Sequence, residues 1–173
     1  MEFTFETIFD QKAVAAMAKT LRKTIRKKRS RRVHILGWVA VVLGLLFTLP
    51  LGGNEFTLDI RTIITWLAGL VILTVLLFED SINGYIARKR MLAGTGRGTA
   101  VFQDETFSIA TEVGKTEFFY EKINLFAETD SYFVFVYDKN HAQVYDKSKL
   151  SGGSADEFRK FIEKKTGRTV EKI

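Results

Sequence analysis

Two long runs without a single charged residue constrain this chain more than any other feature. Residues 33–51 and residues 62–78 contain no Asp, Glu, Lys or Arg. As a helix, the first run spans about 28 Å, close to the roughly 30 Å hydrocarbon core of a bilayer. Two internal helices of a soluble domain are the alternative, but such helices seldom lack a charged face. We therefore expect two transmembrane helices, over about residues 33–51 and 60–78.

Basic residues flank these runs at only one end of each. Only Arg61, beside Glu55 and Asp59, lies between the runs, and Pro50 and Gly52-Gly53 end the first helix. The flanking cations are Arg22, Lys23, Arg26, Lys27, Lys28, Arg29, Arg31 and Arg32 before the first run, and Arg88, Lys89 and Arg90 after the second. Because positive loops stay in the cytoplasm, the sequence predicts a tight hairpin with both termini cytoplasmic.

These eleven cations have three interpretations. The first is that they only fix the orientation, which needs no ligand. The second is that they contact anionic lipids, each contributing about 1 kcal/mol, with Glu79 and Asp80 neutralising part of the cluster. The third is nucleic acid. Residues 98–173 hold 11 basic and 13 acidic residues, a net charge of −2, so we expect no nucleic-acid partner.

Small residues lie on one face of each apolar run. Gly37, Ala40 and Gly44 share a face of the first helix, and Thr65 and Gly69 form a small-xxx-small pair on the second. Such faces allow close helix packing, within one chain or in a homo-oligomer. The alternative is that small residues are simply common in membrane helices.

The segments next to the runs indicate a soluble part. Polar and apolar residues alternate over residues 2–6, which predicts a strand. Asp10 is a typical N-cap for a helix from Gln11, which we expect to continue unbroken to about residue 49. The second helix is expected to pass residue 78 and end before the linker Gly94-x-Gly96-x-Gly98, so both helices form a short stalk.

The sequence pattern after residue 98 is typical of a β-rich domain that ends in a helix. We expect strands at 99–103, 106–112, 115–120, 123–128, 132–137 and 141–145. Ser154 and Glu157 form a capping box, and Gly167 can end the helix. The sheet would leave an exposed edge, where the N-terminal strand can pair. The expected organisation is α+β, with a strand at 1–9, a helical stalk and hairpin at 10–93 and a domain at 98–173.

Several of these segments resemble one protein family. Residues 118–123, 129–133 and 157–162, together with Lys147, are similar to the YcxB-like proteins, small bacterial membrane proteins with a strand, two spans and a β-rich domain. The resemblance implies a pleckstrin-homology-like split barrel capped by a helix, in the bacterial inner membrane. Residues 144–146 depart from the family, which is more aliphatic there and carries a proline. No activity follows from the resemblance.

Few residues are available for catalysis. The chain has no Cys and only two His. His34 is expected at the membrane interface and His141 in a turn, and the glycine segment follows a helix and precedes a strand, the reverse of a dinucleotide site. We expect no enzyme, no metal and no cofactor.

The sequence thus favours a non-enzymatic interaction module, anchored at the cytoplasmic face of the membrane by its hairpin. Its expected partners are a bilayer with anionic lipids and a membrane or cytoplasmic protein. An immunity protein against a membrane-active peptide or toxin is one alternative. An accessory subunit of a transporter or stress sensor is another.

Overall fold

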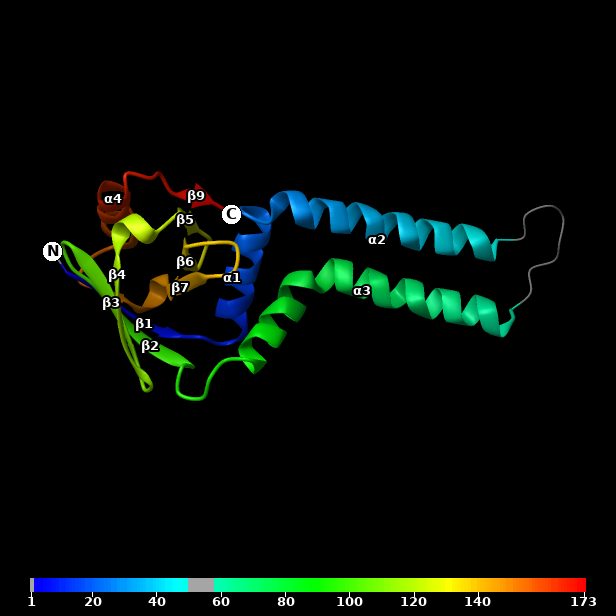
Figure 1. Ribbon diagram of the computed structural model, residues 1–173, viewed down its shortest axis with the longest axis horizontal. Coiled ribbons are helices and arrows are strands. Elements are labelled where there is room, and N and C mark those ends of the chain that lie inside the picture. Colours follow the sequence, from blue (N-terminus) through cyan, green and yellow to red (C-terminus); the bar gives the residue numbers. More distant parts are fainter. Residues whose placement is uncertain (1, 50–57) are drawn as a thin grey trace.

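The computed structural model describes residues 2–49 and 58–173 (Figure 1). Pro50, Gly52, Gly53 and Glu55, and with them the expected hairpin turn, lie outside the described residues. The helices are α1 (Gln11–Lys23), α2 (Lys27–Thr48), α3 (Ile60–Lys89) and α4 (Ala155–Thr166). The strands are β1 (Phe3–Ile8), β2 (Arg97–Phe102), β3 (Thr106–Thr111), β4 (Gly114–Phe119), β5 (Leu125–Glu128), β6 (Tyr132–Val136), β7 (Ala142–Asp146), β8 (Leu150–Ser151) and β9 (Glu171–Lys172). Two 3₁₀ turns, η1 (Tyr120–Lys122) and η2 (Lys147–Lys149), complete the chain.

Helices α2 and α3 are both long and apolar enough to cross a membrane. They lie side by side and extend away from the rest of the molecule (Figure 1). Large apolar side chains along them are exposed, among them Leu36, Phe47 and Ile64. The interior of a soluble domain would bury such residues, so these helices are not core helices of this fold.

The expected continuous helix from residue 11 to residue 49 is wrong, because the chain turns between α1 and α2. Thr24 leaves the helical region at φ −107° and ψ −97°, and the Arg26 amide donates to the Leu21 carbonyl. The hydroxyls of Thr20 and Thr24 donate to carbonyls four residues earlier, a bond that bends helices. The bend lets α1 follow the soluble domain while α2 points away from it (Figure 1).

The larger sheet has five strands in the order β4-β3-β2-β1-β8. The N-terminal strand β1 pairs antiparallel with β2, with Phe5 opposite Ala100, and on its other side with β8. Residues at the start of the chain therefore complete a sheet made by residues nearly 100 positions later. Phe3, Phe5 and Thr7 are buried, whereas Glu6 and Ile8 are exposed, as the alternation predicts.

The second sheet has four strands in the order β7-β6-β5-β9. Strand β9 pairs parallel with β5, a pairing that the sequence did not indicate. The described strands form two sheets and no closed barrel. The α+β class is confirmed at this level.

Aromatic rings fill the space between the sheets and α4. The Phe5 ring lies 4.7 Å from that of Phe158 and 5.5 Å from that of Tyr145, and Phe102 contacts the same two rings. Helix α4 starts at the expected capping box and ends at Gly167, whose φ of 64° suits glycine. It presents Phe158 and Ile162, both fully buried, to the core.

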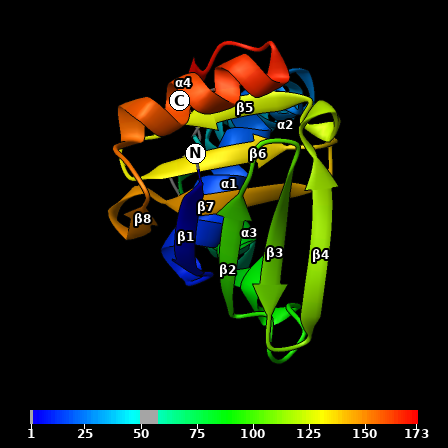
Figure 2. The same cartoon turned by 90° about the vertical axis from the view of Figure 1, so that its left-hand side faces the viewer.

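Helix α1 connects the domain to the long helices. On one side, Ala13 and Leu21 pack with Val134, Val136 and Val144 of the second sheet. On the other side α1 lies against α3, so closely that a Cβ on Gly84 would come within 2.9 Å of the Ala15 backbone. The five-stranded sheet, the second sheet, α1 and the long helices thus follow one another along the molecule (Figures 1 and 2).

Candidate functional site

Polar and charged side chains join α1, α2 and α3 where the domain meets the long helices. The Arg22 guanidinium of α1 binds the Asp80 carboxylate of α3 through two hydrogen bonds, of 2.7 and 2.6 Å. His34 Nε2 of α2 lies 2.6 Å from Glu79 Oε2, which in turn lies 3.7 Å from Arg22 Nε. Two acids of α3 therefore hold α1 and α2 together. The sequence indicated that Glu79 and Asp80 neutralise part of the basic cluster, but not that Arg22 and His34 are their partners.

A cleft of about 570 Å³ opens beside this junction. Its walls come from α1, α2 and the C-terminal strand β9, and they are predominantly cationic. The lining residues are Arg22, Lys23, Lys27, Ser30, Arg31, His34, Glu171, Lys172 and Ile173. Ammonium and guanidinium groups in such a cleft can bind a phosphate or carboxylate. Glu171 is the one acidic side chain among these residues.

The structure separates the eleven expected lipid contacts into groups. Arg22 binds Asp80, and Arg26 donates to the Lys139 carbonyl at 2.7 Å, so both are used within the protein. Lys23, Lys27 and Arg31 line the cleft. Arg29 lines a second cleft of about 290 Å³ between α1, α2 and α3, together with Arg22, Arg26 and Glu79. Lys28 and Arg32 are exposed on α2.

Arg88, Lys89 and Arg90 lie elsewhere. They follow the kink at Phe78, where φ is −111° and ψ is 20°, by about three helical turns. Arg88 donates to the Phe9 carbonyl at 2.9 Å, at the start of α1. The structure therefore does not bring these three cations to the cleft.

The small residues of the long helices are brought together in part. A groove of about 300 Å³ between α2 and α3 is lined by Ala40, Gly44, Thr65 and Gly69 among others. Gly37 lies outside the groove, where a Cβ would come within 2.8 Å of the Leu76 side chain. Gly37 thus permits close approach of α2 and α3, whereas a Cβ on Gly69 would meet nothing within 4 Å.

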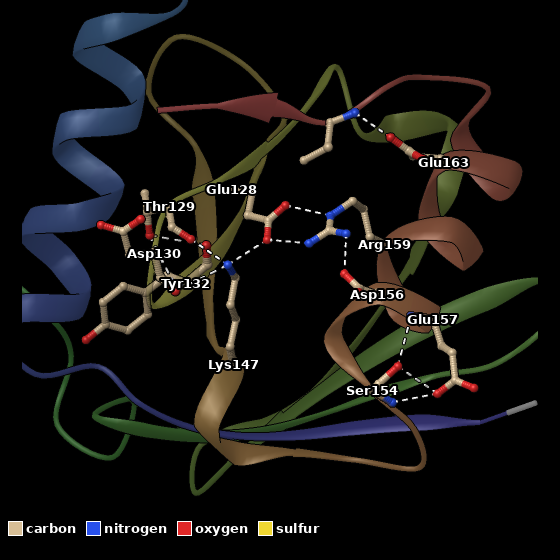
Figure 3. A network of polar contacts seen from close by, with 11 residues as sticks. Glu128, Thr129, Asp130, Tyr132, Lys147, Ser154, Asp156, Glu157, Arg159 and Glu163 are labelled. Carbon is tan, nitrogen blue, oxygen red and sulfur yellow. Dashed lines mark hydrogen bonds and ion pairs between the residues drawn. The ribbon is translucent and has the colours of Figure 1, made fainter.

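A second polar network lies inside the domain, and the sequence reasoning missed it. Glu128 on β5 accepts two hydrogen bonds of 2.7 Å from Arg159 of α4 and one of 2.6 Å from Lys147 (Figure 3). The Glu128 side chain is only 7% exposed. Hydrogen bonds from Arg159 and then from Lys147 lower its pKa to about 2, against the opposing effect of burial.

This network ties three segments together and is structural. Lys147 also donates to the Thr129 carbonyl and lies 5.0 Å from the centre of the Phe133 ring. Arg159 also binds Asp156, one turn earlier in α4. The charged groups of Glu128, Lys147 and Arg159 point at each other (Figure 3). Lys147 and Arg159 both lie in the segments that carry the family resemblance.

Neither histidine lies in a metal-ligand cluster among the described residues, where no group of three or more His, Cys, Asp or Glu is placed to hold an ion. His141 Nδ1 lies 2.8 Å from Asp138 in an exposed turn. Asp138 also accepts the amides of Asn140 and His141, and these bonds lower its pKa to about 2. Asp138 thus shapes the β6–β7 turn.

Comparison with known proteins gives one match. The protein-family model described as YcxB-like protein matches residues 102–162, from the end of β2 through most of α4. No curated protein and no solved structure matches the chain. The resemblance drawn from residues 118–162 is therefore confirmed over residues 102–162.

Proposed function

We propose that this YcxB-like chain is a non-enzymatic interaction module anchored in the bacterial inner membrane. Helices α2 and α3 are its two spans, and both termini lie in the cytoplasm with the α+β domain. The two sheets capped by α4 support a pleckstrin-homology-like relationship for this domain. The partner is a protein that binds the domain at the cytoplasmic face.

Apolar exposure and charge together support the membrane anchor. Large side chains such as Leu36, Ile64 and Val71 are exposed along both long helices, which is costly in water but favourable in lipid. Cations gather at the domain end of α2, as the positive-inside rule requires of a cytoplasmic end.

The observation that carries the proposal is the rigid attachment of the domain through α1. This helix packs on the second sheet by Ala13 and Leu21, and on α3 at Gly84 and through the Arg22–Asp80 ion pair. The domain therefore keeps one orientation relative to the spans. In that orientation the outer face of the five-stranded sheet points away from the spans (Figure 2). Thr99 and Ala110 are exposed on that face.

Anionic lipids bind in the cationic cleft under this proposal. The cleft lies at the first turns of α2, where a span leaves the cytoplasm, and it presents Lys23, Lys27 and Arg31. A lipid phosphate there would be held by charge-assisted hydrogen bonds at headgroup depth. The headgroup would then stabilise the domain orientation that α1 sets.

The test is photo-crosslinking in cells from single positions of the full chain. A photoreactive residue at Thr99, on the outward sheet face, is expected to give a discrete adduct with a cytoplasmic protein. The matched position is Leu70 on α3, which is 59% exposed on the span. Adducts from Leu70 and none from Thr99 would contradict the proposal and favour a role within the membrane, such as immunity or a transporter subunit.

A further inference from the structure

Strand β4 is an open edge of the five-stranded sheet. It pairs with β3 alone, and Gly114 to Glu117 and Phe119 are exposed. In Figure 2 nothing lies beside its outer edge. The outward amide and carbonyl groups of such a strand are available to another strand. Among the described residues no helix or loop covers this edge.

We propose that β4 pairs antiparallel with β4 of a second copy of this chain, about a two-fold axis at Thr116. In this register the position numbers of opposite residues sum to 232. Lys115 then faces Glu117 of the second copy, and Thr116 faces Thr116. The two sheets become one continuous sheet across the axis.

Charge complementarity favours a second copy of this chain as the partner of β4. Lys115 and Glu117 both lie on the outer face of the sheet, because Phe118 points inward to stack on Phe107 and Tyr137. A lysine on an edge strand usually discourages pairing. Here a two-fold copy supplies the opposite charge to each, so two Lys–Glu pairs form by symmetry.

The apolar residues match in the same register. Phe119 is 57% exposed on the outer face of β4, and Val113, in the turn between β3 and β4, is 55% exposed. In this register each would lie near the other residue of the second copy. On the inner face Phe118 would lie opposite Gly114. A Cβ on Gly114 would meet nothing within 4 Å, so there is room for the ring of the second copy.

The membrane orientation fits such a pair. A two-fold axis that joins two sheet edges into one sheet is perpendicular to that sheet. Figure 2, seen along the long direction of the molecule, shows the strands of this sheet nearly face-on. The axis therefore runs roughly along α2 and α3, and both copies insert their spans in the same direction. For this shared orientation the inference rests on the proposed function, and it adds a second copy of the chain to the cytoplasmic partner proposed there.

The size of the contact predicts where the dimer forms. One edge of six residues buries less than the roughly 800 Å² per partner of a standard interface. Confinement of both copies to one bilayer raises their effective concentration. The dimer is therefore expected in the membrane and not on dilution into detergent.

Disulfide trapping tests the register directly. Because the chain has no Cys, Thr116→Cys is a single-cysteine protein. Opposite Cα atoms in an antiparallel pair lie about 4.5 or 5.5 Å apart, and both separations suit a disulfide. Oxidation of membranes that contain the full chain is expected to give covalent homodimer. Thr169→Cys, at an exposed position between α4 and β9, is the matched control for random collisions.

Charge exchange separates this interface from contacts between spans. Lys115→Glu places like charges opposite each other twice, as does Glu117→Lys, and each is expected to lower the trapped dimer roughly fivefold to tenfold in the Thr116→Cys background. The double exchange restores opposite charges across the axis and should recover the dimer. Proteolysis of the domain in each variant checks that it is folded.

Two results would overturn the inference. One is equal trapping from Thr116→Cys and Thr169→Cys. The other is a dimer that both single exchanges leave unchanged, which would place the contact in the spans. A heterologous adduct from Thr99 alongside either result would leave the interaction module standing with a different partner, so the two proposals fail separately.

Discussion

Replacing Glu128 by Gln should destabilise the soluble domain strongly at neutral pH. The substitution keeps the shape of the side chain but removes the charge that Arg159 and Lys147 bind, at 2.7 and 2.6 Å. Both cations are largely buried, with side chains 25% and 19% exposed. Removal of the carboxylate charge leaves Lys147 without its ion pair and Arg159 with Asp156 alone, and loss of one partner from a buried pair costs about 3–5 kcal/mol.

The pKa gives a second measure of the same quantity and a sign for its pH dependence. The pKa of Glu128 falls from 4.5 to about 2, a difference that corresponds to roughly 3 kcal/mol at pH 7. Because the folded pKa is the lower one, this stabilisation is complete above pH 4.5 and is lost as the pH falls toward 2. Near pH 3 less than half of it remains.

The assay is proteolysis of the full chain in urea, in lipid nanodiscs, at pH 7 and at the lowest pH that an acid-stable protease allows. Intrinsic fluorescence is unsuitable, because Trp38 and Trp66 both lie in the long helices. Glu121→Gln is the matched control, since that side chain is 76% exposed and its bond to Lys122 is 3.8 Å long. Glu128→Gln with wild-type stability at pH 7, or a difference that does not shrink in acid, would refute the reasoning.

Three further predictions concern packing and lipid. Phe5→Ala should lower the stability of the domain by about 3–5 kcal/mol in the same proteolysis assay, because the Phe5 ring lies among four other rings. Ile8→Ala on the same strand should have little effect, because Ile8 is 50% exposed. Equal effects of the two substitutions would contradict the burial of β1. Gly84→Val should push α1 away from α3 and speed backbone hydrogen exchange in α1, because the new Cβ would lie 2.9 Å from the Ala15 backbone. Gly69→Val, whose Cβ would meet nothing within 4 Å, should leave hydrogen exchange in α1 unchanged. The double variant Lys27→Gln, Arg31→Gln should co-purify with less anionic phospholipid, as measured by native mass spectrometry. The control, Lys160→Gln with Lys164→Gln, removes two exposed cations of α4 and should leave the bound lipid unchanged. Equal amounts of lipid on the two double variants would contradict the lipid site.

The local elements were predictable because their signals are local. Alternation places Phe3 and Phe5 inward on β1, and the capping box at Ser154 starts α4 where expected. Each of the six expected C-terminal strands overlaps an observed one. Two-residue strands such as β8 and β9 carry no alternation of their own, so their pairing follows only from the tertiary fold.

The break between α1 and α2 was missed for a related reason. Residues 20–26 contain no Gly or Pro, and Thr20 and Thr24 are weak signals unless their hydroxyl bonds are known. The turn forms because Ala13 and Leu21 pack on the second sheet, a preference that overrides local propensity.

The charged sites were foreseeable only in part. The basic residues before α2 were visible as a cluster, and the cleft brings Lys23, Lys27 and Arg31 together. The sequence could not show that Arg22 and Arg26 are used inside the protein, because their partners lie 58 and 113 residues away. Glu128 was missed because a single acid in a strand does not reveal the two cations, distant in the chain, that bind it.

The orientation of the domain is the central claim, and cysteine labelling in intact cells tests it most directly. One single-cysteine protein carries Asn54→Cys in the loop between the spans, and another carries Lys149→Cys on η2, where the side chain is exposed. An impermeant thiol reagent should label Asn54→Cys in intact cells, and Lys149→Cys only after the membrane is permeabilised. Labelling of Lys149→Cys in intact cells, with Asn54→Cys protected, would contradict the cytoplasmic placement of the domain.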